Sequence, residues 1–215
     1  MALQEITDHL DATVAGLDQH GERIGAADAP VTLTFWADLQ CPSSKTFAFT
    51  ALRDLLAEEV RAGTLAVRFR PLATTTEDPD VFVLQHAAAA AAGAQDRLWD
   101  YVQVFLLTQR EENSGYVTPR HLALVAQQVD GLDLHRWAQD MAGDHQAGLI
   151  AATQDARAAG VTGTPGLALS ADGVTVGPVI PHLASIRAEI ADLIDSDDDA
   201  APAADEDTHE RGRTA

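Results

Sequence analysis

The chain of 215 residues carries 33 acidic and 14 basic side chains, which gives a formal net charge of −19 at pH 7. A charge of this size argues against nucleic acid and against an anionic membrane surface as partners, because both would repel the protein. Hydrophobic residues make up 46% of the chain, an ordinary share for one globular domain with or without an inserted subdomain.

Residues 1–19 predict a helical extension, because apolar residues recur at helical spacing from Leu3 to Leu17. This segment has neither the basic start nor the long apolar stretch of a signal peptide. Cys41 is the single cysteine, so no disulfide can form within the chain. We therefore expect a cytoplasmic protein, since a reducing compartment is the default for chains without disulfides.

A β-α-β unit is predicted after a short strand and turn at residues 19–30. Residues 31–36 form a short run rich in β-branched and aromatic residues, which is typical of a buried strand. Residues 42–63 predict one helix, with proline at its first position and glycine at its end. Residues 65–70 alternate as a second strand, so we expect the two strands to pair in parallel.

Residues 79–159 show helical patterns only, and they predict an inserted helical subdomain. Thr118 before Pro119 and Asp133 have the residue types that cap helix starts, and Gly160 is a suitable stop. The expected helices span residues 80–93, 96–110, 119–129, 133–145 and 147–159.

The histidines and alanines of this segment have ordinary interpretations. Eight histidines are scattered along the chain without metal-ligand spacing, so no metal is expected. His86 and His121 fall on predicted helices and are interpreted as surface residues or as hydrogen-bonded core residues. The run Ala87–Ala92 is interpreted as a site of close helix packing.

The C-terminal part returns to strands. A strand is predicted at residues 166–170, a hairpin turn at Asp172-Gly173, a strand at 174–177 and a helix at 182–194. Residues 20–78 and 160–194 would together form the α/β domain. Residues 195–215 hold eight carboxylates and two arginines, a charge of 2 − 8 = −6, and predict an acidic disordered tail.

Cys41 is the candidate for chemistry, because it lies where the strand at 31–36 gives way to a helix. The free N–H groups and the positive dipole at a helix start favour a thiolate over a thiol. An ordinary thiol, with a pKa of about 8.5, is only roughly 3% ionised at pH 7. Lys45 lies on the same helical face and would favour the thiolate further, whereas Asp38 would raise the pKa of the thiol if its side chain points toward it.

The approach Pro30-Val-Thr-Leu-Thr-Phe-Trp-Ala-Asp-Leu-Gln-Cys41-Pro42, the turn Gly160-Val-Thr-Gly-Thr-Pro165 and the helical stretch between them resemble the DsbA-type thiol-disulfide oxidoreductases. The resemblance covers about residues 20–194. It implies an α/β, thioredoxin-like fold with an inserted all-helical subdomain. It also implies that Cys41 is the nucleophile, that Pro165 is a cis-proline beside it, and that Pro42, Thr164 and Pro165 shape the substrate groove.

The chain departs from this family at one position, because Ser44 stands where the Cys-Pro-x-Cys motif has its resolving cysteine. No dithiol cycle within the chain is then possible, and single-cysteine disulfide exchange at Cys41 remains. Ser44 can still donate a hydrogen bond to the thiolate. The partner would be a thiol- or disulfide-containing protein or a small thiol such as glutathione as co-substrate, with no bound cofactor.

Two alternatives stay open. The loss of the second cysteine also fits a thioredoxin-fold module that binds partners without redox chemistry. With serine at position 44, the motif also resembles the Ser-Pro-x-Ser type motif of the kappa-class glutathione transferases and 2-hydroxychromene-2-carboxylate isomerases. These enzymes have a helical insertion as well. That reading predicts affinity for glutathione.

Overall fold

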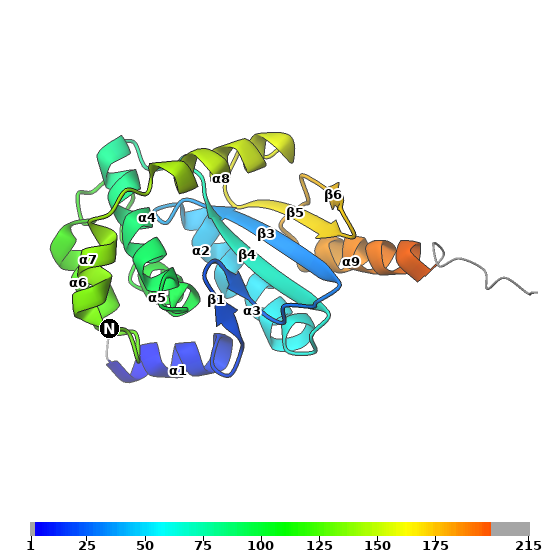
Figure 1. Ribbon diagram of the computed structural model, residues 1–215, viewed down its shortest axis with the longest axis horizontal. Helices are drawn as coiled ribbons and strands as arrows, with labels where there is room; N and C mark the ends of the chain where they lie inside the picture. The colour runs from blue at the N-terminus through cyan, green and yellow to red at the C-terminus, as the bar shows by residue number, and fades with distance from the viewer. Residues whose placement is uncertain (1–2, 199–215) are drawn as a thin grey trace, which may run out of the picture.

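A computed structural model describes residues 3–198 and shows a single mixed β-sheet with helices packed around it (Figure 1). Among these residues no helix is long and apolar enough to cross a membrane. The sheet has six strands, in the order β1 (Gln19–His20), β2 (Arg23–Ile24), β4 (Leu65–Pro71), β3 (Val31–Ala37), β5 (Gly166–Ala171) and β6 (Val174–Val176).

Strand β3 lies at the centre of the sheet and ends at the candidate site. It pairs in parallel with β4, where Leu33 lies opposite Val67, and antiparallel with β5, where Leu33 lies opposite Leu169. The predicted parallel β-α-β unit is therefore confirmed. Because side chains alternate along a strand, Leu33 and Phe35 enter the main core, whereas Trp36 enters a smaller cluster on the opposite face.

The helix predicted over residues 42–63 is divided. It forms α2 (Pro42–Phe49), α3 (Ala51–Leu55) and a π-helical turn at Leu56–Val60. The division falls at Thr50, whose backbone leaves the helical region at φ −120° and ψ −98° and whose hydroxyl donates to the carbonyl of Thr46 at 2.7 Å. Such bonding of a threonine to the preceding turn bends helices, and the apolar pattern alone does not report it.

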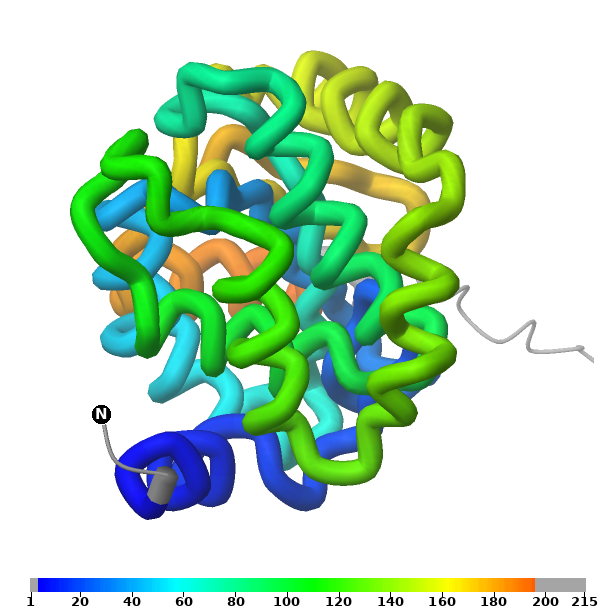
Figure 2. Tube along the Cα trace, turned by 90° about the vertical axis from the view of Figure 1, so that its left-hand side faces the viewer, coloured from blue at the N-terminus to red at the C-terminus, as the bar shows by residue number. Residues whose placement is uncertain are grey.

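Helices are the regular structure of the segment between β4 and β5, as predicted; most of them lie at one end of the sheet (Figure 1), whereas the last one packs against β4. Figure 2, which faces that end, shows its green helices in front of the sheet. The expected caps are confirmed, since Thr118 accepts a hydrogen bond from the backbone of His121 and Asp133 accepts from those of His135 and Arg136. Its helices are α4 (Pro79–Gly93), α5 (Leu98–Leu107), α6 (Pro119–Ala126), α7 (Leu134–Met141) and α8 (Gln146–Ala158).

The two ends of the chain differ from expectation in their boundaries. Helix α1 (Leu3–Thr13) ends four residues before the predicted end at residue 17. Helix α9 (Leu183–Asp198) packs against α3 and against strands β3 and β5, and it continues four residues into the segment predicted as a disordered tail. The rest of that segment, residues 199–215, lies outside the described residues.

Candidate functional site

The structure places Cys41 at the start of α2, as the N-cap residue directly before Pro42. Its backbone is extended, with φ −71° and ψ 118°, and Pro42 takes the first helical position. Two backbone bonds hold this turn, from Cys41 N–H to the Asp38 carbonyl at 3.0 Å and from Lys45 N–H to the Cys41 carbonyl at 3.2 Å. The sulfur thus lies at the end of the helix where backbone N–H groups are free to meet an anion.

A second loop brings Thr164 and Pro165 against this cysteine, although they are more than 120 positions away in the sequence. The thiol of Cys41 donates a hydrogen bond to the Thr164 carbonyl at 3.4 Å. The peptide bond between Thr164 and Pro165 is cis. The hydroxyl of Thr164 is hydrogen-bonded to that of Thr74, in the loop that follows β4. Two of the residues predicted for the site, Cys41 and Thr164, therefore meet in space, and Pro165 follows Thr164 directly.

The pKa of the Cys41 thiol is lowered by its surroundings. Burial acts in the opposite direction and raises it, since only 5% of the residue is exposed. Hydrogen bonds to the ionised sulfur outweigh that cost, and they come from the side chain of Thr164, from the N–H and hydroxyl of Ser44, and from the side chain of Thr75. Donors that point at a thiolate favour the charged form, which is the reactive form of cysteine.

Ser44 has a completely buried side chain, and its hydroxyl makes no hydrogen bond with the neutral thiol or with any other group in the described part of the chain. It nevertheless belongs to the groups that lower the pKa of Cys41, because an ionised sulfur within its reach is a stronger acceptor than a thiol. A buried hydroxyl without a partner has a free-energy cost of about 1–3 kcal/mol, and ionisation of Cys41 relieves it.

The structure does not bring Lys45 to the thiol. Its ammonium group lies over the ring of Phe49, 5.8 Å from the ring centre, one turn further along α2. Partial burial lowers the pKa of Lys45. The shared helical face predicted from the sequence is correct, but the long side chain extends away from Cys41, and no hydrogen bond or ion pair joins the two side chains in the described structure.

Asp38 is also turned away from the sulfur. Its carboxylate is fully buried and accepts hydrogen bonds from the N–H groups of three consecutive threonines, at 3.2, 3.0 and 2.7 Å. It also accepts from the hydroxyl of Thr76 at 2.6 Å, the N–H of Gln40 at 3.0 Å and the side-chain amide of Gln85 at 3.1 Å. Burial raises the pKa of Asp38, but the bonds from Thr76, Thr75 and Gln40 lower it by more. Asp38 thus holds the Thr74–Thr76 loop beside the cysteine.

Three amide side chains that sequence reasoning did not single out support the same turn. Gln109 donates from its side chain to the carbonyls of Leu39 and Cys41, at 2.9 and 3.2 Å. Gln40 accepts from the N–H of Asn113 at 2.9 Å, and Asn113 donates to the Thr75 carbonyl at 3.0 Å. Only Gln40 lies near Cys41 in the sequence, and nothing in the pattern of the helical insertion marks the other two.

Gly166 allows the loop that carries Thr164 to lie close to β3. A Cβ atom at this position would overlap the side chain of Val161 and lie 2.8 Å from the Gly163 carbonyl oxygen. We expect Gly166→Ala to lower the free energy of unfolding by about 2 kcal/mol and to raise the pKa of Cys41 as the loop shifts. Gly163→Ala is the control, since a Cβ there meets nothing within 4 Å. Equal denaturant midpoints for the two variants would contradict the expectation.

Comparisons with known proteins concern the family and the fold. The family model described as Thioredoxin matches residues 18–178. The chain is 34% identical over 144 residues to the Na(+)/H(+) antiporter NhaA 3 of Salinispora tropica, an alignment that covers 66% of this chain and 20% of that protein. It is 24% identical over 127 residues to the probable disulfide bond formation protein D of Bacillus anthracis, covering 56% of this chain and 55% of that protein. The chain therefore spans about a fifth and about half of these relatives.

Solved structures share the fold. Oxidised BdbD from Bacillus subtilis matches with a TM-score of 0.68 at 17% identity, over 85% of this chain and 98% of that one. DsbA from Chlamydia trachomatis matches with a TM-score of 0.67 at 15% identity, over 82% of this chain and 91% of that one. At these identities the likeness concerns the fold. With a family match over most of its length and this architecture, the chain belongs to the thioredoxin family and has the fold of the DsbA-type oxidoreductases, including their helical insertion.

Proposed function

We propose that the protein is a thiol-disulfide oxidoreductase that works with one cysteine. The Cys41 thiolate attacks one sulfur of a substrate disulfide, a mixed disulfide forms between Cys41 and that sulfur, and the second substrate sulfur leaves as a thiolate. An external thiolate, from glutathione or another small thiol, then attacks the mixed disulfide. This second exchange releases the substrate as a disulfide with the small thiol and regenerates the Cys41 thiolate, so electrons balance without a second cysteine in the chain.

The environment of Cys41 carries this proposal. A cysteine kept only for packing has no need of donors around its sulfur, whereas this one has Ser44, Thr75 and Thr164 arranged to lower its pKa. Thr164 and the cis bond to Pro165 lie on one side of the thiol. In this arrangement a substrate peptide would lie along the Thr164 loop, with its sulfur next to Cys41.

Alkylation kinetics test whether the thiolate is stabilised. We expect the rate of Cys41 modification by iodoacetamide to follow a titration with an apparent pKa below about 8.5, the value for an ordinary thiol. Ser44→Ala removes a donor to the thiolate, so it should raise the apparent pKa by about one unit, equivalent to about 1.4 kcal/mol. Mass spectrometry identifies the modified residue.

Ser43→Ala is the matched control for that experiment, because Ser43 lies on the same helical turn but is exposed. It should leave the alkylation profile unchanged. An unmodified protein that alkylates like a free thiol, or a Ser44→Ala variant that titrates like the unmodified protein, would contradict the proposed activation.

A binding module without redox chemistry is the second candidate, and the 5% exposure of Cys41 favours it, since an inert cysteine is usually buried. The two candidates differ in one result. Exchange chemistry predicts that Cys41→Ala abolishes formation of a mixed disulfide with oxidised glutathione or a disulfide peptide. A binding module predicts that the same variant binds the reduced and oxidised peptide as well as the unmodified protein does.

A further inference from the structure

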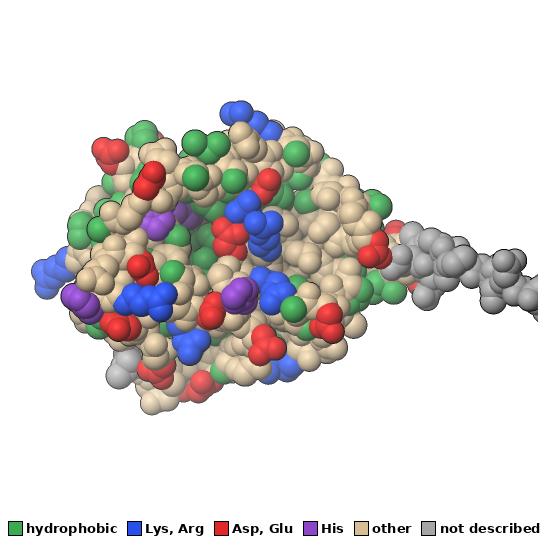
Figure 3. All heavy atoms as spheres, in the orientation of Figure 1, with side chains coloured by type: hydrophobic (Ala, Val, Ile, Leu, Met, Phe, Trp, Pro, Cys, Tyr) green, Lys and Arg blue, Asp and Glu red, His purple; other side chains and the backbone are tan. Residues whose placement is uncertain are grey.

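A cavity of about 370 Å³ lies between α4 and β4, where Phe69, Ala89 and Leu98 of the main core help to line it, and it opens on the face that Figure 3 shows. Figure 3 shows a hollow on this face, floored by hydrophobic side chains and ringed by charged ones. Neither Cys41 nor Thr164 lines it. Its size lies at the lower end of the range of small-molecule sites, roughly 300–1,000 Å³.

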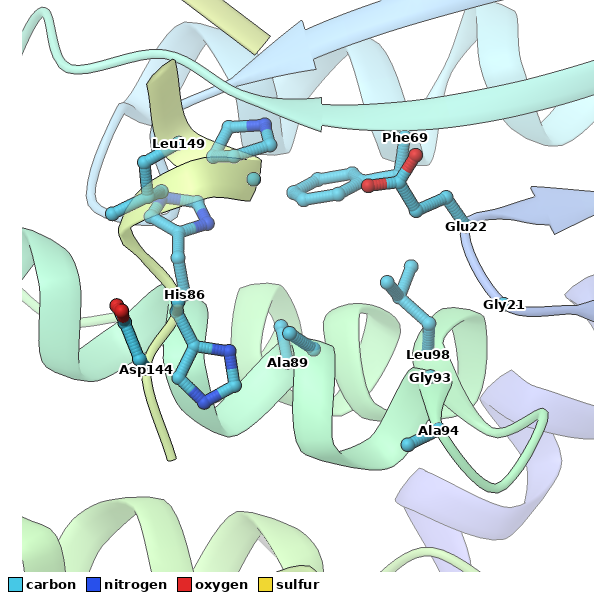
Figure 4. A pocket seen from close by; sticks show the side chains of 14 residues that line it. Gly21, Glu22, Phe69, His86, Ala89, Gly93, Ala94, Leu98, Asp144 and Leu149 are labelled. Atoms are coloured by element: carbon cyan, nitrogen blue, oxygen red, sulfur yellow. The ribbon is translucent and has the colours of Figure 1, made fainter. Parts of the chain in front are cut away.

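The two walls of the cavity leave a slot between them. Figure 4 shows α4 below, with Ala89 and Gly93 on it and Ala94 directly after its end, and the ring of Phe69 pointing into the space from β4 above. Alanine and glycine give the lower wall a flat surface. The Ala87–Ala92 run therefore does more than pack helices. Its inner side does pack closely, since the Ala88 carbonyl accepts a hydrogen bond from the indole of Trp137 at 2.8 Å.

His86 lies at one end of this slot and differs from expectation. It is 4% exposed, and neither ring nitrogen has a hydrogen-bond partner among the described residues. Its ring packs instead against two aromatic rings, with centres 4.5 Å from that of Phe82 and 6.0 Å from that of Phe69. The prediction of a surface or hydrogen-bonded histidine is therefore wrong. A buried polar group without a partner lowers the free energy of unfolding by about 1–3 kcal/mol. A bound ligand or a water molecule would remove this cost.

The charges around the slot restrict what it can hold. Burial lowers the pKa of His86 to about 4, against a smaller opposing effect of Asp38, so the ring is neutral at pH 7 with one donor and one acceptor nitrogen. The rim carries two carboxylates, Glu22 and Asp144, and the slot itself is lined mainly by apolar side chains, so an anion that entered it would lose its hydration. Glu22 is already paired with Arg68 and Arg70, at 3.1 and 3.0 Å, so it offers little to a cation.

We propose that this cavity binds an uncharged planar aromatic molecule that carries a hydroxyl group. The ring would lie between the small residues of α4 and Phe69, and the hydroxyl would bond to a nitrogen of His86. A phenolic hydroxyl both donates and accepts, so it matches a neutral imidazole whichever nitrogen carries the proton. Leu98 and Leu149 line the same space and would contact the edges of the ring.

Three related probes test this assignment on the full chain: 2-naphthol, naphthalene, which lacks the hydroxyl, and 2-naphthoate, which is charged. We expect 2-naphthol to bind with a Kd below about 1 mM, and 2-naphthoate to bind at least ~10-fold more weakly, because its carboxylate would lose hydration in the apolar slot and lie near Asp144. His86→Leu should lower the affinity for 2-naphthol about tenfold, the equivalent of about 1.4 kcal/mol. It should change the affinity for naphthalene less than about twofold. Titrations followed by NMR give the affinities.

Ala90→Phe should abolish binding of 2-naphthol and naphthalene, because Ala90 is an exposed residue that lines the slot. Ala188→Phe, at an exposed position of α9, is the matched control and should bind normally. Cys41→Ser should also bind normally, so failure of the proposed exchange chemistry would leave this result intact.

The assignment is wrong if Ala90→Phe folds and still binds 2-naphthol with unchanged affinity, or if the three probes bind equally well. If a variant does not fold, the test is made on the unmodified protein instead. Nuclear Overhauser contacts between 2-naphthol and the ring protons of His86 and Phe69 are expected, and their absence at saturation would refute the site. If none of the probes shows saturable binding, the only partner of His86 is water, and the proposal is also overturned.

Discussion

Asp38→Ala is expected to lower the free energy of unfolding by at least about 3 kcal/mol. The carboxylate has no exposed surface and accepts six hydrogen bonds, three of them from consecutive backbone N–H groups of the Thr74–Thr76 loop. Alanine would leave these donors buried without an acceptor. Hydrogen bonds to a charged group contribute about 1.5–3 kcal/mol each, but their effects do not add in full. Urea denaturation monitored by circular dichroism measures the loss.

Asp54→Ala is a suitable control for this prediction. Asp54 pairs with Arg53 at 2.9 Å on the surface, and exposed pairs of this kind contribute roughly 0–1 kcal/mol. The second readout is the thiol. The loop that Asp38 holds carries Thr75, one of the donors to the Cys41 thiolate, so Asp38→Ala should also raise the apparent pKa of Cys41 alkylation. If Asp38→Ala is as stable as Asp54→Ala, other contacts are sufficient to hold the Thr74–Thr76 loop, and the prediction is wrong.

The stabilising effect of Asp38 depends on pH in a defined direction. Its pKa in the folded protein lies below the ordinary value of 3.8, because hydrogen bonds outweigh burial. The contribution is therefore fully present above about pH 4 to 5 and is lost as the pH falls through the folded pKa. The difference in unfolding free energy between the unmodified protein and Asp38→Ala should be constant near neutrality and shrink in acid. A difference that grows in acid would contradict this assignment.

Ser44→Cys is expected to create a disulfide with Cys41, where the unmodified protein can form none. The Ser44 side chain is buried and within reach of the Cys41 sulfur, to which it is a donor in the ionised state. Oxidised glutathione supplies the oxidising equivalents and leaves as two reduced molecules for each protein disulfide formed. The product contains no bound glutathione and no free thiol, which mass spectrometry distinguishes from the mixed disulfide expected of the unmodified protein.

Ser43→Cys provides the matched control for this gain of function. Ser43 is exposed on the first turn of α2, so its side chain points away from Cys41. Under the same treatment it should form mixed disulfides at both cysteines. In refolding of a reduced substrate protein with oxidised glutathione as the oxidant, Ser44→Cys should pass its own disulfide to the substrate and be reoxidised by glutathione, whereas Ser43→Cys has no internal disulfide to pass on. If the two variants behave alike, the side chain of residue 44 does not face the nucleophile.

The surroundings of His86, in the helical insertion, could not be predicted from the sequence. The pattern of residues 80–93 predicts a helix, and α4 forms at Pro79–Gly93. A helical pattern states which residues share a face, but the hydrogen bonding of His86 depends on β4 and on the residues around α8. None of these neighbours supplies an acceptor or donor to its ring. The pattern of residues along the chain therefore cannot predict that the His86 ring lacks a hydrogen-bond partner.

The sequence by itself determined the elements and the place of the nucleophile. Apolar periodicity, the proline at the start of α2 and the caps at Thr118 and Asp133 are local properties, because each depends on residues within a few positions of one another. The position of Cys41 between β3 and α2 follows from the same local signals, and the serine at position 44 is read directly from the chain.

Only the tertiary structure decided what surrounds that cysteine. Asp38 turns to the Thr74–Thr76 loop and to Gln85, 47 positions away, and Lys45 lies along Phe49. Thr164 reaches the sulfur from 123 positions away. The direction of a polar side chain is chosen by the donors and acceptors that folding brings within hydrogen-bond distance, and buried groups must find them there because water is excluded. Such pairings arise between distant segments, so the sequence alone leaves them open.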